Sequence, residues 1–191
     1  MTTLITGGAG YIGSHVVYSL LDAGRSVVVL DDLSTGKREH LPEEAPLVVG
    51  NAGDRQLVGE LIDEHDIDSA IHLAGSTVAP ESVDKPLEYY ENNTSVARDL
   101  MEALVDGGVD RFVFSSTAAI YGDLAEVPVS EEAPKSPVNP YGRSKLVVEW
   151  MLEDAAAAFE DFEYCALRYF NVAGADPDGR TRHDTPSATP P

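Results

Sequence analysis

Tyr141 and Lys145 are the residues whose types and spacing are best suited to chemistry. They stand four positions apart at the start of a helix-like run, so their side chains share one helix face. A phenol ordinarily has a pKa of about 10, too high for a general base at neutral pH. The ammonium group of Lys145 favours the phenolate and is expected to lower this pKa. The pair is a candidate general base, with Thr117 hydrogen-bonding the same substrate oxygen.

This spacing also occurs by chance on helix surfaces, so the pair needs support from its surroundings. A glycine-rich turn at residues 6–13 follows a strand-like start and opens a helix-like run at residues 11–23. Gly7 allows a tight turn, Gly10 lets the backbone approach a pyrophosphate, and Gly13 lets the helix pack close to the strand. The helix N-terminus offers free N–H groups to the anion. This context favours dinucleotide binding over a glycine turn of some other α/β protein.

Two acids, Asp31 and Asp32, follow the next strand-like segment, residues 26–30. A carboxylate about 20 residues after the glycines can accept hydrogen bonds from both ribose hydroxyls. The same charge repels a 2′-phosphate, so NAD is expected rather than NADP. An oxidised nicotinamide beside Tyr141 would favour its phenolate further.

Strand-like and helix-like segments alternate along the chain, which predicts an α/β fold with a doubly wound parallel sheet. The further strands are expected at residues 47–49, 69–73, 111–116 and 163–169, the further helices at 54–64, 88–105 and 140–159, and a long loop at 117–139. Ligands of such sheets bind beyond the carboxyl ends of the strands. Residues 1–175 are predicted to form this NAD-binding domain. Residues 176–191, polar and proline-rich, are predicted to be a disordered tail.

Acidic residues dominate the composition, with 33 Asp and Glu against 13 Lys and Arg and a net charge of -20. Nucleic acid is a disfavoured partner because phosphate contacts need basic side chains. Self-repulsion at this charge is weakened by salt, which indicates a halophilic protein; an ordinary acidic protein is the alternative. No apolar run is long enough to span a membrane. With one cysteine, Cys165, no internal disulfide is possible, and a cytoplasmic location is expected. No residue cluster has the spacing of a metal site.

Together these motifs resemble the UDP-glucose 4-epimerase family of the extended short-chain dehydrogenase/reductases. The matching segments are 6–15, 30–36, 72–75, 85–93, 114–122, 140–145 and 167–175. The resemblance implies a Rossmann fold that binds NAD and a UDP-sugar. It implies removal of the C4 hydrogen as hydride, rotation of a 4-keto intermediate, and return of the hydride to its other face, which interconverts UDP-glucose and UDP-galactose.

The resemblance also implies residue roles. Tyr141 is expected to be the catalytic base, Lys145 to bind the nicotinamide ribose, and Thr117 to replace the family's catalytic Ser/Thr. Asn171, with Thr117 and Tyr141, is expected to face the sugar. The residues expected to contact NAD are Gly7, Gly10, Tyr11, Ile12, Asp31, Leu73, Ala74, Asn92 and Lys145. Ala118 and Ala119 stand where the family's sugar dehydratases have Asp-Glu, which argues against dehydration.

The chain departs from the family pattern at three places. Asn51-Ala52 interrupts a Gly-Asp pair, Thr77 stands where many members have Lys, and most of the usual C-terminal substrate domain is missing. Epimerase activity is therefore expected to be impaired. The alternatives are a non-catalytic NAD-binding module left from a truncated epimerase and a dehydrogenase acting on another small substrate.

A homodimer is also expected, since in the family the helices corresponding to 88–105 and 140–159 pair across a two-fold axis. These helices carry more apolar residues than a solvated surface needs. The residues in question are Tyr89, Tyr90, Leu100, Leu104, Leu146, Trp150 and Leu152.

Overall fold

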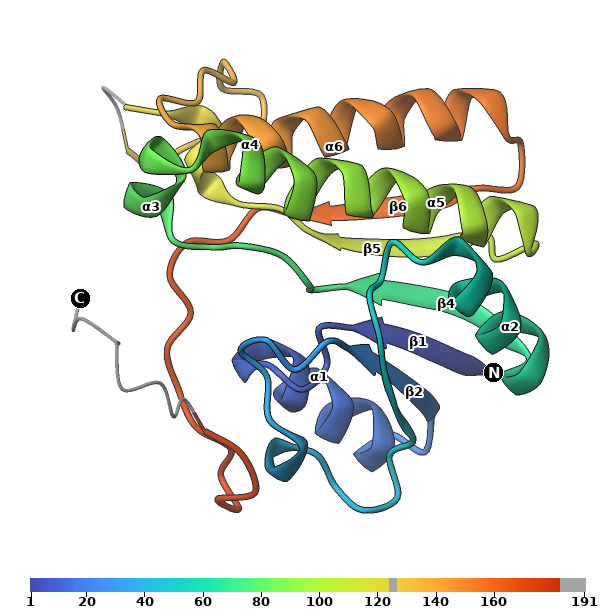
Figure 1. Ribbon diagram of the computed structural model, residues 1–191. Helices are drawn as coiled ribbons and strands as arrows, with labels where there is room; N and C mark the ends of the chain where they lie inside the picture. Colours follow the sequence, from blue (N-terminus) through green and yellow to red (C-terminus); the bar gives the residue numbers. More distant parts are fainter. Residues whose placement is uncertain (124–126, 183–191) are drawn as a thin grey trace.

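A six-stranded parallel sheet forms the centre of the molecule in the computed structural model, which describes residues 1–123 and 127–182 (Figure 1). The strand order is β3-β2-β1-β4-β5-β6. The strands are β1 (Thr2–Thr6), β2 (Ser26–Asp31), β3 (Leu47–Val49), β4 (Ile67–His72), β5 (Arg111–Ser115) and β6 (Glu163–Leu167). The order reverses between β1 and β4, as in a doubly wound sheet, so the predicted fold class is confirmed. The ends of β1 and β4 flank this switch point, where ligands of such sheets bind.

Helices cover both faces of the sheet (Figure 1). They are α1 (Tyr11–Asp22), α2 (Arg55–His65), α3 (Ala79–Asp84), α4 (Pro86–Tyr89), α5 (Val96–Asp106) and α6 (Pro140–Ala158). Shorter segments are the 3-10 helices η1 (Arg38–His40) and η3 (Ala118–Tyr121) and a π-helical segment η2 (Tyr90–Ser95). No helix within the two described ranges is long and apolar enough to cross a membrane.

Two apolar clusters attach the helices to opposite faces of the sheet. Leu4 and Val28 pack with α2, α5 and α6 on one face. Ile5 and Val29 pack with Val17 of α1 on the other face. Neighbouring residues of β1 and β2 point to opposite faces, so these strands are apolar at successive positions rather than at alternate ones.

The helix expected at residues 88–105 is instead three segments, α4, η2 and α5. Pro86 is the first residue of α4, where its missing N–H costs no hydrogen bond. The π-helical turn of η2 buries Asn93, which the apolar periodicity did not reveal. A short helix, α3, precedes this unit and was not predicted.

Most of the apolar residues expected at a subunit contact pack inside this chain. The buried ones are Tyr89, Leu100, Leu104, Leu146 and Leu152. Tyr90 is half-buried, and Trp150 is 52% exposed. The apolar excess of these helices therefore comes largely from the core of the chain itself.

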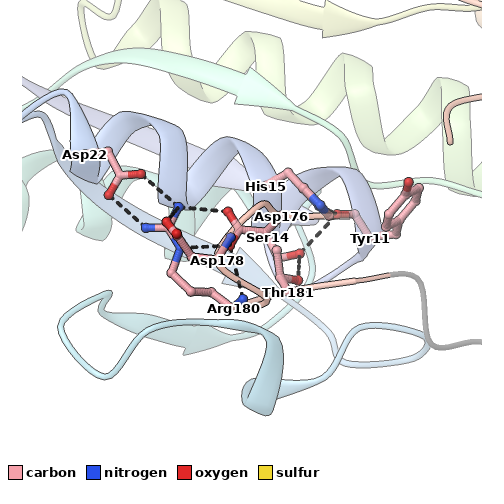
Figure 2. Close-up of polar contacts among 8 residues, drawn as sticks. All are labelled: Tyr11, Ser14, His15, Asp22, Asp176, Asp178, Arg180 and Thr181. Carbon is pink, nitrogen blue, oxygen red and sulfur yellow. Dashed lines mark hydrogen bonds and ion pairs between the residues drawn. The ribbon is translucent and has the colours of Figure 1, made fainter. Parts of the chain in front are cut away.

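Residues 176–182, expected to belong to a disordered tail, form a turn held against α1 (Figure 2). The Asp176 carboxylate accepts hydrogen bonds from the backbone N–H groups of Asp178 and Arg180, at 3.0 and 3.1 Å. The Arg180 guanidinium donates to both carboxylate oxygens of Asp22 at 2.9 Å. Charge pairing and local hydrogen bonds thus order a segment that has almost no large apolar side chain.

Two further contacts join residues 174–182 to the start of α1, and Figure 2 shows the one between Ser14 and Thr181. The hydroxyls of Ser14 and Thr181 lie 2.6 Å apart, and Thr181 is 3% exposed. The Tyr11 hydroxyl donates to the Gly174 carbonyl at 2.8 Å. Residues 183–191, the rest of the expected tail, lie outside the described residues.

Candidate functional site

The glycine turn between β1 and α1 leaves no room for side chains. A Cβ at Gly7, whose φ is +73°, would lie 2.5 Å from the Ala74 nitrogen. A Cβ at Gly13 would lie 2.2 Å from the Gly7 carbonyl oxygen. Gly10 is the N-cap of α1, with no capping side chain and no acidic residue in the first turn. A helix start without a capping side chain or an acidic residue suits an anion such as a pyrophosphate.

The two acids at the end of β2 differ in their surroundings. Asp31 is 7% exposed, and its two oxygens accept from the N–H groups of Ala9 and Leu33, each at 2.9 Å. A carboxylate has about four acceptor positions, so two bonds leave capacity for ribose hydroxyls. Asp32 is exposed and accepts from the N–H and hydroxyl of Ser34. Asp31 is thus fixed against the glycine turn, whereas Asp32 belongs to a surface turn.

Gly36 is a site residue that the sequence reasoning missed. A Cβ there would lie 2.9 Å from both the Asp31 Oδ1 and the Ala9 Cβ. In the sequence, the segment 30–36 contributes only to the family resemblance, since Gly36 comes close to the Asp31 carboxylate only because the loop returns to the glycine turn.

The loop after β4 is held by two neighbouring asparagines of η2. Asn92 donates to the Ser76 hydroxyl at 3.1 Å. Asn93, 1% exposed, accepts from the Ser76 N–H at 2.8 Å and donates to the Ser76 carbonyl and the Ser144 hydroxyl at 3.0 Å. Leu73, the predicted NAD contact before this loop, donates its N–H to the Thr6 carbonyl. Asn92 and Asn93 therefore hold this loop against η2, and Asn93 also connects it to Ser144 of α6. The sequence indicated Asn92 but gave no sign that Asn93 is buried.

Lys145 is buried on the inner face of α6, which is capped by the Asn139 side chain. It is 2% exposed, and its Nζ lies 4.9 Å from the centre of the Phe114 ring. Burial lowers the pKa of Lys145 to about 8. Within the described parts of the chain, Nζ has no hydrogen-bond acceptor or carboxylate partner. A buried ammonium without acceptors is costly, so this group suits a ligand that carries hydroxyls.

Tyr141 is half-buried one helical turn before Lys145, with the Tyr89 ring edge-on at 6.4 Å. Burial raises the pKa of Tyr141, a hydrogen bond with the Thr117 side chain opposes that rise, and Tyr169 adds to it. The lowered pKa expected from the sequence is therefore wrong for the protein without its ligand. The reason is that removing the phenolate from water outweighs the other effects.

Thr117 follows β5 and caps η3, accepting from the Ala119 N–H at 3.1 Å. It is 7% exposed. The structure thus brings Thr117 and Tyr141 together, with Lys145 on the same side of α6. Asn171 is exposed in the segment after β6. The binding and catalytic roles of these residues stay predictions.

His72, at the end of β4, is a packed residue. It is completely buried, its Nδ1 lies 2.6 Å from the Thr6 hydroxyl, and its ring stacks near Phe112 and Phe114. Burial and the nearby Lys145 charge lower the pKa of His72 to about 3, so the ring is neutral. Among the residues that the structure describes, no group of three or more His, Cys, Asp or Glu side chains could hold a metal ion.

Comparison with known proteins connects this geometry to one family. The sequence model described as the NAD dependent epimerase/dehydratase family matches residues 3–189. A UDP-glucose 4-epimerase of Azospirillum brasilense is 54% identical over 186 residues, which cover 97% of this chain and 53% of that protein.

Solved structures give the same result. A UDP-glucose 4-epimerase from Stenotrophomonas maltophila, with bound NAD and formylated UDP-arabinopyranose, has a TM-score of 0.93 at 39% identity, covering 100% of this chain and 58% of that one. One from Bifidobacterium longum, in complex with NAD+ and UDP, has a TM-score of 0.91 at 35% identity, covering 96% and 57%. The chain spans about half the length of the relatives it matches.

Proposed function

Because the chain belongs to the NAD dependent epimerase/dehydratase family, we propose that it binds NAD and carries the catalytic residues of a UDP-sugar 4-epimerase. The interconversion would be that of UDP-glucose and UDP-galactose. The observation that carries the proposal is the buried Lys145 ammonium, which has no acceptor among the residues that the structure describes and lies one helical turn from the Tyr141 phenol. The names of the relatives support the choice of substrate.

NAD would lie along the carboxyl edge of the sheet. The N-terminus of α1 would take the pyrophosphate, and Asp31 would take the adenosine ribose hydroxyls. Lys145 Nζ would donate to the nicotinamide ribose. The close contacts at Gly7 and Gly13 support this fit, because a side chain at either position would fill the turn. Bound NAD supplies a hydride acceptor and donor for carbon 4 of the sugar.

Tyr141 would move the proton. Its phenolate oxygen would take the proton of the sugar's 4-hydroxyl as the C–H bond breaks, becoming the neutral phenol, and would return that proton when the C–H bond reforms. Thr117 would hold the same oxygen by a hydrogen bond. The cation of Lys145 would favour the phenolate, against the burial that raises the pKa of Tyr141.

Two other functions, a dehydrogenase and a non-catalytic NAD-binding module, are distinguished from an epimerase by the assay described below. Ala118 and Ala119 lie in η3 directly after Thr117 and have no acid–base group, which favours epimerisation over dehydration. A dehydrogenase would accumulate reduced cofactor with a small alcohol, and a non-catalytic module would bind NAD and turn nothing over.

A coupled assay for UDP-glucose formation from UDP-galactose tests the proposal, with Tyr141→Phe as the blank. Positioning can supply about 7–11 kcal/mol of a barrier. The 191 residues match about half the length of the relatives. Assayed alone, this chain should therefore convert UDP-galactose far more slowly than a full-length relative does. Measurable turnover that is equal in the parent and in Tyr141→Phe would refute the assignment of the base, whereas no turnover in either would favour the non-catalytic module.

We further propose a halophilic homodimer. The net charge of -20 supports the first part, since salt screens self-repulsion. Leu87, Trp150 and Phe159 are 81%, 52% and 48% exposed. They support a contact between two copies across the α4–α6 side of the molecule.

A further inference from the structure

Glu149 is a buried carboxylate on the same face of α6 as the two catalytic candidates. Tyr141, Lys145 and Glu149 stand at intervals of four residues, so they form one row along the helix. Glu149 is 1% exposed and lies outside every role assigned above.

The first contact of Glu149 is with the residue before Thr117. Its Oε1 accepts a hydrogen bond from the Ser116 hydroxyl at 2.5 Å, and Ser116 is itself 1% exposed. This bond connects α6 directly to the end of β5, where the chain turns into η3.

The second contact reaches the other end of that turn. Arg168, just after β6, donates from Nε to Glu149 Oε1 at 3.0 Å and from Nη2 to Oε2 at 2.8 Å. Its Nη1 donates to the hydroxyl of Tyr121, the last residue of η3, at 2.8 Å. A two-point guanidinium–carboxylate pair fixes orientation as well as distance.

The turn that carries Thr117 is therefore held at Ser116 and at Tyr121, and both attachments lead to Glu149. Next to Arg168, the Tyr169 carbonyl also accepts from the Ala118 N–H at 3.1 Å. Lys135, from the long loop, lies 3.5 Å from Glu149 Oε2 and from Glu153 Oε1.

We propose that Glu149 is a positioning residue that sets the Thr117 hydroxyl against the Tyr141 phenol, acting through Ser116 and Arg168. The inference rests on the proposed function, because it assigns Thr117 and Tyr141 to one substrate oxygen. If the buried ion pair had a purely structural role, breaking it would lower stability without changing the bond between those two side chains.

A double-mutant cycle on the ionisation of Tyr141 tests this, without substrate or turnover. The chain is labelled at tyrosine 13Cζ, and Tyr141→Phe assigns the Tyr141 NMR signal. In the parent, Thr117→Val should raise the pKa of Tyr141, since the Thr117 bond lowers it. In Glu149→Gln, which keeps the side-chain size and removes the charge, Thr117→Val should have little further effect.

Glu153→Gln is the matched control, because it removes an equal charge one turn later beside the same Lys135. There the Thr117→Val effect should stay as large as in the parent. Ser116→Ala, which removes the direct bond alone, should behave like Glu149→Gln and decides the question if Glu149→Gln does not fold. An undiminished Thr117→Val effect in Glu149→Gln and Ser116→Ala, or its loss in Glu153→Gln, overturns the proposal. A failed epimerase assay leaves this result unaffected, so the two proposals fail separately.

Discussion

Replacing Gly13 by Ala should separate the packing role of the glycine turn from ordinary helix propensity. The added Cβ would lie 2.2 Å from the Gly7 carbonyl oxygen and 2.6 Å from the Gly8 Cα. Both are backbone atoms of the turn, so α1 must move away from β1. Gly59, inside α2, is the matched control, since a Cβ there meets nothing within 4 Å.

The two substitutions should change stability in opposite directions. Overpacking typically costs about 1–3 kcal/mol, and more where backbone must shift. An unstrained Gly→Ala change inside a helix contributes about 0.5–1 kcal/mol of stabilisation. At about 2–4 °C per kcal/mol for a chain of this size, Gly13→Ala should lower Tm by roughly 2–12 °C. By the same conversion, Gly59→Ala should raise Tm by roughly 1–4 °C.

Thermal melts in molar salt, followed by calorimetric titration with NAD, measure both effects. Gly13→Ala should also bind NAD more weakly, because the N–H groups proposed to take the pyrophosphate would move with α1. Gly59→Ala should bind like the parent. Equal Tm and equal NAD affinity in Gly13→Ala and the parent would refute the close-packing argument.

Three further predictions concern burial, charge and assembly. Lys145→Met should raise the free energy of unfolding at pH 7 by up to about 3 kcal/mol, because it removes a buried cation. The pKa of Lys145 is about 8 in the folded protein against an ordinary 10.5. The gain in stability, measured by denaturant unfolding, should therefore shrink as the pH rises from 8 to above 10. A variant less stable than the parent at pH 7 would contradict this prediction. The parent Tm should rise from low to molar salt, and a Tm indifferent to salt is evidence against halophily. Light scattering of the parent should find a dimer, and the Trp150→Glu variant should be a monomer. A parent that is monomeric at every salt concentration rules out the proposed dimer.

The fold was predictable because strands and helices alternate with clear apolar patterns. The glycine turn and Asp31 were also visible, since their spacing follows directly from a tight turn and one helix. The break of the expected helix 88–105 into α4, η2 and α5 was not visible, because no glycine or proline at residues 87–105 marks it.

The buried polar groups were beyond sequence reasoning for a different reason. Glu149 is one acid among 33 Asp and Glu, and its burial depends on partners that come from other elements, Arg168 above all. Asn93 likewise depends on Ser76 and Ser144, which come from separate elements. The direction of the Tyr141 pKa was mispredicted because burial cannot be read from residue spacing.

NAD binding to the parent chain tests the central claim most directly. Calorimetric titrations in molar salt with NAD and NADP should show tighter binding of NAD, because in the proposed site the Asp31 carboxylate would face the ribose and repel a 2′-phosphate. Asp31→Ala should narrow the difference between the two cofactors. No heat of binding with NAD, or equal affinities for NAD and NADP in the parent, would contradict the account.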